Sequence, residues 1–265
     1  MQNILKYPRC GKTNKFLNVA IKTAKGAGSI LMNLRRKRLV KYKSDTSLLT
    51  QADLISEKFI KKELKKAFPW HNILSEEAGL EKKKSAYTWI IDPIDGTTNY
   101  FRNLFVWCIS IGLVYRNEVI VAVIFDPVRK EMFHAVKGHG AFLNGKKIRV
   151  GTAREPRKSL IFLAGVRTNT AKERLSKAFG LGKSFGTVRI LGTIALQLCY
   201  LADNRGDGIY AIESEPWDRG TGLFIAKEAG AKIIYLKKGR DIFSPQTFVA
   251  ANSSKLAKEI RKLVV

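Results

Sequence analysis

Acidic residues and cysteines are scarce in this 265-residue chain. It has 22 Asp and Glu against 48 Lys and Arg, which gives a formal net charge of +26 at pH 7. The three cysteines, Cys10, Cys108 and Cys199, are an odd number, lie far apart and include no Cys-x-x-Cys pair. This pattern argues against a disulfide frame and against a cysteine zinc site, and it favours a reducing cytoplasm.

Long hydrophobic runs are also absent. No apolar run approaches the roughly 20 residues that a membrane-spanning helix needs, and Val119–Phe125 is typical of a buried strand. The N-terminal segment carries Lys6, Arg9 and Lys12 but no apolar stretch, which is not the pattern of a secretory signal. We therefore expect a cytoplasmic protein without a membrane partner.

The basic residues are spread over most of the chain, in groups such as Arg35–Arg38, Lys82–Lys84 and Lys146–Lys147. Such a spread is typical of a solvated, lysine-rich surface. A net charge of +26 also attracts polyanions, so contact with nucleic acid stays open beside binding of a phosphorylated substrate. Because acids are few, the places where they cluster are informative.

The spacing of apolar residues changes along the chain between the helical period and the strand period. With 45% apolar residues, the chain can bury a full core as one domain, residues 1–265, with a soft boundary near residue 151. The pattern predicts an α/β (α+β) layered sandwich, αβαβα, with a mostly antiparallel N-terminal sheet and a mixed C-terminal sheet. The predicted helices are 14–34, 51–67, 171–178, 193–202, 216–230 and one from 253 onward; the predicted strands are 88–91, 106–115, 119–125, 130–136, 160–164, 188–191, 208–212, 232–236 and 247–251.

Two glycines lie inside the first predicted helix. Gly26 and Gly28 each weaken a helix by about 1 kcal/mol relative to alanine. Their presence predicts close packing of this helix against another element.

The segment 92–100, Asp-Pro-Ile-Asp-Gly-Thr-Thr-Asn-Tyr, directly follows a predicted buried strand. We expect Pro93 to end the strand and Gly96 to permit a tight turn, so that Asp92 and Asp95 converge. Converging carboxylates repel one another unless a proton or a cation bridges them, and oxygen ligands favour Mg²⁺. The N–H groups of residues 96–98 (Gly96, Thr97 and Thr98) then form a phosphate cradle at a helix start.

This segment resembles the signature of the inositol monophosphatase family, within the lithium-sensitive, magnesium-dependent sugar phosphatases. Four further motifs of the family are matched in order, so that the resemblance covers nearly the whole chain. They are the glutamate motif 75–79, the glycine-rich hairpin 138–145, the segment 189–195 and the Trp-Asp motif 215–222.

The resemblance implies a two-metal phosphomonoesterase with two to three Mg²⁺ ions. It implies that Glu76, Asp92 and the Ile94 carbonyl hold the first ion, that Asp92, Asp95 and Asp218 hold the second, and that a third rests on Glu76 and water. Thr97, oriented by Asp53, would position the attacking water, and the Gly96 and Thr97 amides would bind phosphate. The family also implies a homodimer.

Some of these acids have a purely structural alternative. Asp53 forms Thr-x-x-Asp with Thr50, which is a capping box for the second helix, and both roles can hold together. Asp218 lies in the first turn of its helix, where the helix dipole favours any carboxylate by about 0.3–1 kcal/mol. Trp217 is expected to pack rather than to stack on a substrate.

The chain departs from the family where inositol is usually contacted. The position seven residues before Asp218 holds Ala211 instead of an acid. The predicted substrate is therefore a small phosphorylated metabolite, either inositol monophosphate or a related sugar phosphate such as fructose 1,6-bisphosphate. The alternatives are a 3′-phosphoadenosine 5′-phosphate nucleotidase, and an RNA- or RNA-polymerase-associated binding protein that uses the basic surface.

Overall fold

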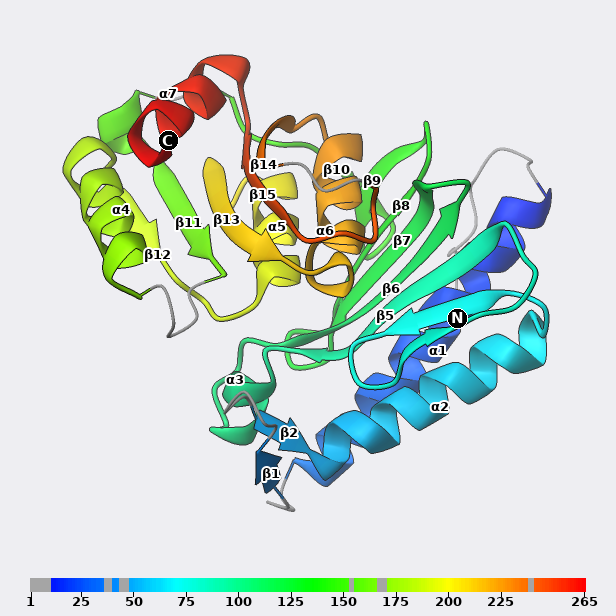
Figure 1. Ribbon diagram of the computed structural model, residues 1–265. Helices are drawn as coiled ribbons and strands as arrows, with labels where there is room; N and C mark the ends of the chain where they lie inside the picture. Colours follow the sequence, from blue (N-terminus) through cyan, green and yellow to red (C-terminus); the bar gives the residue numbers. More distant parts are fainter. Residues whose placement is uncertain (1–10, 36–39, 43–47, 153–154, 166–170, 238–240) are drawn as a thin grey trace.

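The computed structural model describes residues 11–35, 40–42, 48–152, 155–165, 171–237 and 241–265. Two β-sheets are separated by a pair of helices, and each sheet carries further helices on its outer face (Figure 1). None of the described helices is both long enough and apolar enough to span a membrane.

The larger sheet has eight strands in the order β10-β9-β8-β7-β6-β5-β3-β4. Only the β3–β5 pair is parallel. Helices α1 and α2 cover its outer face, and Ala20, Ala24, Ala27 and Leu31 recur on the fully buried side of α1. The elements are α1 (Gly11–Leu34), α2 (Gln51–Ala67), β3 (Asn72–Ser75), β4 (Gly79–Glu81), β5 (Tyr87–Asp95), β6 (Cys108–Tyr115), β7 (Glu118–Asp126), β8 (Glu131–Val136), β9 (Gly140–Leu143) and β10 (Lys146–Ile148).

The smaller sheet has five strands in the order β12-β11-β13-β15-β14. Strand β11 pairs in parallel with β12 and β13, whereas β15 is antiparallel to both of its neighbours. Helices α4 and α7 cover its outer face. The elements are β11 (Leu160–Ala164), α4 (Ala171–Ser184), β12 (Thr187–Arg189), β13 (Gly208–Ser214), β14 (Lys232–Lys237), β15 (Gln246–Ala251) and α7 (Ser254–Val264).

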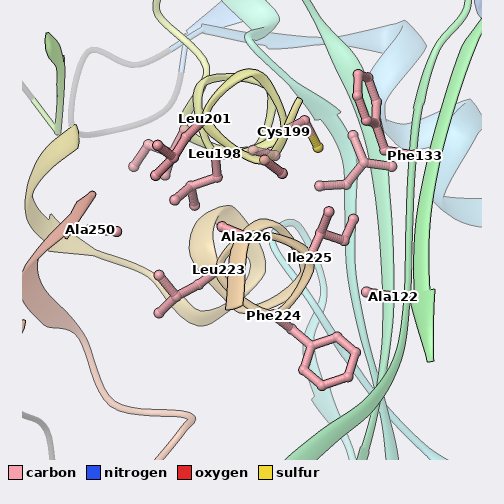
Figure 2. Packing of buried hydrophobic residues seen from close by; sticks show 14 of the residues in the cluster. Ala122, Phe133, Leu198, Cys199, Leu201, Leu223, Phe224, Ile225, Ala226 and Ala250 are labelled. Atoms are coloured by element: carbon pink, nitrogen blue, oxygen red, sulfur yellow. The ribbon is translucent and has the colours of Figure 1, made fainter. Parts of the chain in front are cut away.

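The middle layer consists of α5 (Ile194–Ala202) and α6 (Pro216–Glu228). Every residue of α5 is buried, as expected for a helix that is apolar on all sides. Figure 2 shows Leu198 and Leu201 of α5 beside Leu223 and Ile225 of α6, between the two sheets. The layer order α-β-α-β-α confirms the predicted fold, with one mostly antiparallel and one mixed sheet. The remaining elements are β1 (Val40–Tyr42), β2 (Leu48–Thr50), α3 (Thr97–Phe101) and a 3₁₀ turn (Pro156–Lys158).

The close packing predicted for the two glycines of α1 is confirmed. A Cβ atom on Gly26 would lie 2.6 Å from Phe59 Cζ, and one on Gly28 would lie 2.7 Å from Phe125 Cε1. A larger residue at either position would force the facing phenylalanine ring or the helix to shift.

One prediction about β5 is wrong, because Pro93 does not end this strand. The strand continues to Asp95, and the β5–β6 register shifts between Asp92 and Asp95. A bulge removes residues from the ladder, so a proline without an N–H group is tolerated there.

Candidate active site

The carboxyl end of β5 carries Asp92 and Asp95. Asp92 pairs with Ser110 and Asp95 pairs with Cys108, so the register slips by one residue between them. Residues three apart on a regular strand point to opposite faces, and a bulge changes which way the later side chain points. The bulge therefore allows both acids to approach one site.

Glu76 reaches the same region from β3. Ser75 pairs in parallel with Ile91, and the Glu76 N–H donates to the Ile91 carbonyl at 3.3 Å. The following turn is fixed by Glu57, which accepts from the Ala78 N–H at 3.1 Å. The parallel pairing therefore places Glu76 beside the end of β5, next to Asp92.

Asp218 comes from the first turn of α6, which begins at Pro216. Its Oδ2 accepts from the Glu215 N–H at 3.4 Å, and Ser110 Oγ lies 3.5 Å from the Trp217 carbonyl. The helix contacts β5 and β6, which brings Asp218 over the strand ends.

Asp92 is the electrostatic centre of these acids. It is 1% exposed, and its Oδ1 accepts from the Ile94 N–H at 2.9 Å. Burial raises its pKa well above the usual value, and nearby carboxylates raise it further. These carboxylates are Glu76, Asp95, Asp218 and Asp53. All the acids predicted from the sequence are therefore close enough to act on Asp92.

Asp95 lies against the N-terminus of α5. Its Oδ2 accepts from the Thr193 hydroxyl and, at 2.7 Å, from the Ala195 N–H, and it lies 3.9 Å from Cys108 Sγ. Burial raises the pKa of Asp95 to about 7, although the Thr193 and Ala195 hydrogen bonds act in the opposite direction. None of these three neighbours was predicted. The sequence signals for Thr193 and Ala195 were the family-like segment 189–195 and the predicted helix start at residue 193.

Thr97 and Asp53 are in contact. Asp53 is 1% exposed on α2, and Thr97 Oγ1 lies 3.1 Å from Asp53 Oδ1 and 3.0 Å from the Ile94 carbonyl. The Thr50 side chain, which would complete the predicted capping box, lies outside the described residues.

The turn between β5 and α3 requires glycine. Gly96 has φ +96°, and a Cβ atom there would lie 3.1 Å from the Val106 carbonyl. The turn opens α3, whose first N–H groups, at Thr97 and the exposed Thr98, have no acceptor within the helix. A phosphate group fits such a turn.

A cation fits these residues by chemistry and by charge. The donors are carboxylate oxygens, which divalent hard cations prefer. The pKa of Asp92 is raised first by burial and then by nearby carboxylates, and a bound cation would offset both effects. Within the described ranges, no three His, Cys, Asp or Glu side chains already surround a common point as a complete metal site. A bound ion would therefore draw these carboxylates closer together.

Comparisons with known proteins match nearly the whole chain to one family. The model of the inositol monophosphatase family matches residues 12–265. The chain is 33% identical to the Nus factor SuhB of Haemophilus influenzae over 257 residues, covering 94% of this chain and 96% of that protein. It is 34% identical to inositol monophosphatase 3 of Solanum lycopersicum over 258 residues, covering 93% and 95%.

A solved structure shows the same architecture. The IMPase of Thermotoga maritima superposes with a TM-score of 0.84 at 31% identity, covering 94% of this chain and 96% of that one. With the family model matched from residue 12 to the last residue, this chain belongs to the inositol monophosphatase family.

Proposed function

We propose that this protein is a Mg²⁺-dependent phosphomonoesterase that hydrolyses a small phosphorylated metabolite. The observation that carries this proposal is the burial of the Asp92 carboxylate within electrostatic reach of Glu76, Asp95, Asp218 and Asp53, which together with burial raise its pKa. A buried cluster of like charges is costly to fold and is typical of a site that binds a cation. The family membership of the chain supports the same reaction class.

The residues would hold two to three Mg²⁺ ions as the family pattern implies. Glu76, Asp92 and the Ile94 carbonyl would hold the first ion, and Asp92, Asp95 and Asp218 the second. When bound, Mg²⁺ supplies positive charge that lowers the pKa of water and stabilises a developing alkoxide.

The other residues orient the reactants. The Asp53 carboxylate holds the Thr97 hydroxyl at 3.1 Å, which leaves the hydroxyl oxygen able to accept from a water molecule. The N–H groups of Gly96 and Thr97, with that of Thr98, would bind phosphate oxygens at the α3 turn. The hydrolysis needs no covalent intermediate on the protein.

The substrate range that we propose rests partly on the absence of an acid at position 211. Ala211 is fully buried in the core between the two sheets, so this position offers no group to a substrate hydroxyl. Two residues later, Glu213 is exposed with φ +44°, within the register shift of β13 between Ala211 and Ser214. We therefore expect several phosphate esters to be turned over, with no strong preference for inositol 1-phosphate.

Phosphate release from a panel of esters tests the proposal. The panel holds inositol 1-phosphate, fructose 1,6-bisphosphate, histidinol phosphate, 3′-phosphoadenosine 5′-phosphate and NADP, each with and without Mg²⁺. We expect Mg²⁺-dependent release that lithium inhibits, and at least about a 100-fold loss in Asp95→Asn. Asn keeps an oxygen acceptor for Thr193 and Ala195, so the variant should stay folded.

Absence of Mg²⁺-dependent turnover on every ester would refute the proposal. The alternative of a nucleic-acid-associated protein with a basic surface would then be the better explanation of the +26 charge. Turnover of only the 3′-phosphoadenosine ester would favour the nucleotidase alternative instead.

A further inference from the structure

Arg219, the residue after Asp218, is a fully buried cation. It is 1% exposed, one of the largest fully buried side chains in the described part of the molecule. Its guanidinium donates four hydrogen bonds of 2.8–3.1 Å to oxygen atoms. The side chain is therefore fixed at every nitrogen atom.

These four bonds join separate segments at the end of the smaller sheet. The acceptors are the Ser214 carbonyl at the end of β13, the Gln246 side chain at the start of β15, and the Ile242 and Ser244 carbonyls between β14 and β15. Ser214 and Gln246 face each other just beyond the β13 register shift. Arg219 thus ties the first turn of α6 to the sheet behind it.

Two other polar contacts of this first turn are long. The Glu215 N–H to Asp218 Oδ2 distance is 3.4 Å, and the Ser110 Oγ to Trp217 carbonyl distance is 3.5 Å. Both are at the outer limit for a hydrogen bond, whereas a bond from a charged donor at 2.8–3.1 Å is roughly twice as strong as a neutral one. Arg219 is therefore the strongest of these polar anchors for the turn that carries Asp218.

We propose that Arg219 is a positioning residue that fixes the Asp218 carboxylate in place for metal binding. This inference rests on the proposed function, since it takes Asp218 as a metal ligand. Successive helix residues point about 100° apart, so one side chain can face the smaller sheet while its neighbour faces the β5 carboxylates. Lysine should replace this residue only in part, because an ammonium group lacks the planar fork that reaches acceptors on several segments.

The test measures metal affinity directly. Mg²⁺ is titrated into the purified full-length protein by calorimetry, well below the melting temperature, for the wild type, Arg219→Met, Arg219→Lys and Asp218→Asn. We expect the Mg²⁺ Kd to rise at least about tenfold in Arg219→Met and in Asp218→Asn. The Kd of Arg219→Lys should lie between those of the wild type and Arg219→Met. If Arg219→Met does not fold, Gln246→Ala removes one of the four acceptors and should raise the Kd by about two- to threefold.

Arg205→Met is the matched control. Arg205 binds Glu131 through two bonds of 2.7 and 2.8 Å and Asp203 at 2.8 Å, away from the first turn of α6. Its loss should lower the melting temperature without changing the Mg²⁺ Kd. An unchanged Kd in folded Arg219→Met, or an equal rise in Arg205→Met, would overturn the inference. Failure of the proposed function looks different, because the wild type would then bind Mg²⁺ without hydrolysing any ester.

Discussion

At the residue scale, two buried charged side chains, Asp92 and Arg219, have opposite surroundings. Asp92 lies among other carboxylates, whereas Arg219 lies among carbonyl groups. Burial lowers the pKa of Arg219 to about 10, so the guanidinium stays charged at neutral pH. Each buried charge costs folding free energy. A neutral substitution can remove that cost at Asp92, whereas at Arg219 it would leave four buried oxygen acceptors without their donor.

Asp92→Asn is expected to stabilise the metal-free protein. The substitution removes a buried charge that burial and then Glu76 and Asp95 disfavour, while Asn keeps an acceptor for the Ile94 N–H. Thermal unfolding in EDTA should show a higher Tm, by about 2–4 °C for each kcal/mol of repulsion removed. The increase in Tm that Mg²⁺ gives the wild type should be lost. A lower Tm in EDTA would contradict this account of the cluster.

His134 is expected to make the stability fall in mild acid. It is 4% exposed on β8, stacks on Phe142 at 5.3 Å, and burial lowers its pKa to about 4. Between pH 6.5 and pH 4 the unfolded chain therefore binds a proton that the folded protein excludes, and stability falls as the pH is lowered. The loss should total about 3 kcal/mol below pH 4.

Denaturant unfolding of the wild type and His134→Phe from pH 7 to pH 4 measures this loss. Phenylalanine keeps a ring to stack on Phe142 but cannot take up a proton. The difference in unfolding free energy between the two proteins should change by about 3 kcal/mol across this range. Two curves that stay parallel would show that His134 is not the titrating group.

At the scale of elements, close approach depends on small residues. Gly112 on β6 would place a Cβ atom 2.8 Å from Thr221 Oγ1, and one on Gly220 would lie 2.6 Å from Ile90 Cδ1. These two glycines let α6 lie close to β5 and β6. The distance between this helix and the strands sets how near Asp218 comes to Asp92.

Gly28→Ala in α1 is expected to destabilise the protein although alanine favours helices. The new methyl group would meet Phe125 at 2.7 Å and Pro127 at 3.1 Å. Overpacking of about 1–3 kcal/mol should exceed the gain of about 1 kcal/mol in helix propensity. Gly180→Ala in α4 is the matched control, because nothing lies within 4 Å of a Cβ atom there, and it should be stabilising. Chemical denaturation measures the unfolding free energy of both variants. A Gly28→Ala variant more stable than the wild type would refute the packing argument.

Most elements of five residues or more were predictable from sequence, and the three-residue strand β12 was predicted as 188–191. The helix 51–67 and the strand 160–164 have the predicted bounds, because their apolar spacing is regular. Strands β3 and β4 were missed, since four and three residues are too few to show a period. In the candidate site, the acids were predicted from their motifs. Thr193 was missed because its partner Asp95 lies 98 residues away in sequence, and Arg219 because three of its acceptors lie beyond α6, 23–27 residues later.

At the scale of the whole molecule, the surface carries a large excess of one charge. The 48 basic residues must repel one another on average, because 22 acidic residues are too few to neutralise them. Self-repulsion of this kind destabilises the compact state.

Added salt is therefore expected to raise the Tm. Moving from low ionic strength to about 0.3 M NaCl shortens the Debye length below about 8 Å and screens repulsion between exposed lysines. The Tm should rise by about 2–4 °C for each kcal/mol of repulsion screened. Scanning calorimetry in NaCl, with sucrose of equal osmolality as the control, measures the effect. A flat or falling Tm would mean that the lysines lie too far apart to repel one another.

Because the chain is made from its N-terminus, the middle helix layer is synthesised after the larger sheet that it covers. The larger sheet is finished at Ile148, but α6, which covers its inner face, ends at Glu228. Those 80 residues of further synthesis take about 4–16 s at 5–20 residues per second. During that time the sheet would have one uncovered apolar face, so we expect the yield in a cell to depend on translation speed and on chaperones that shield this face.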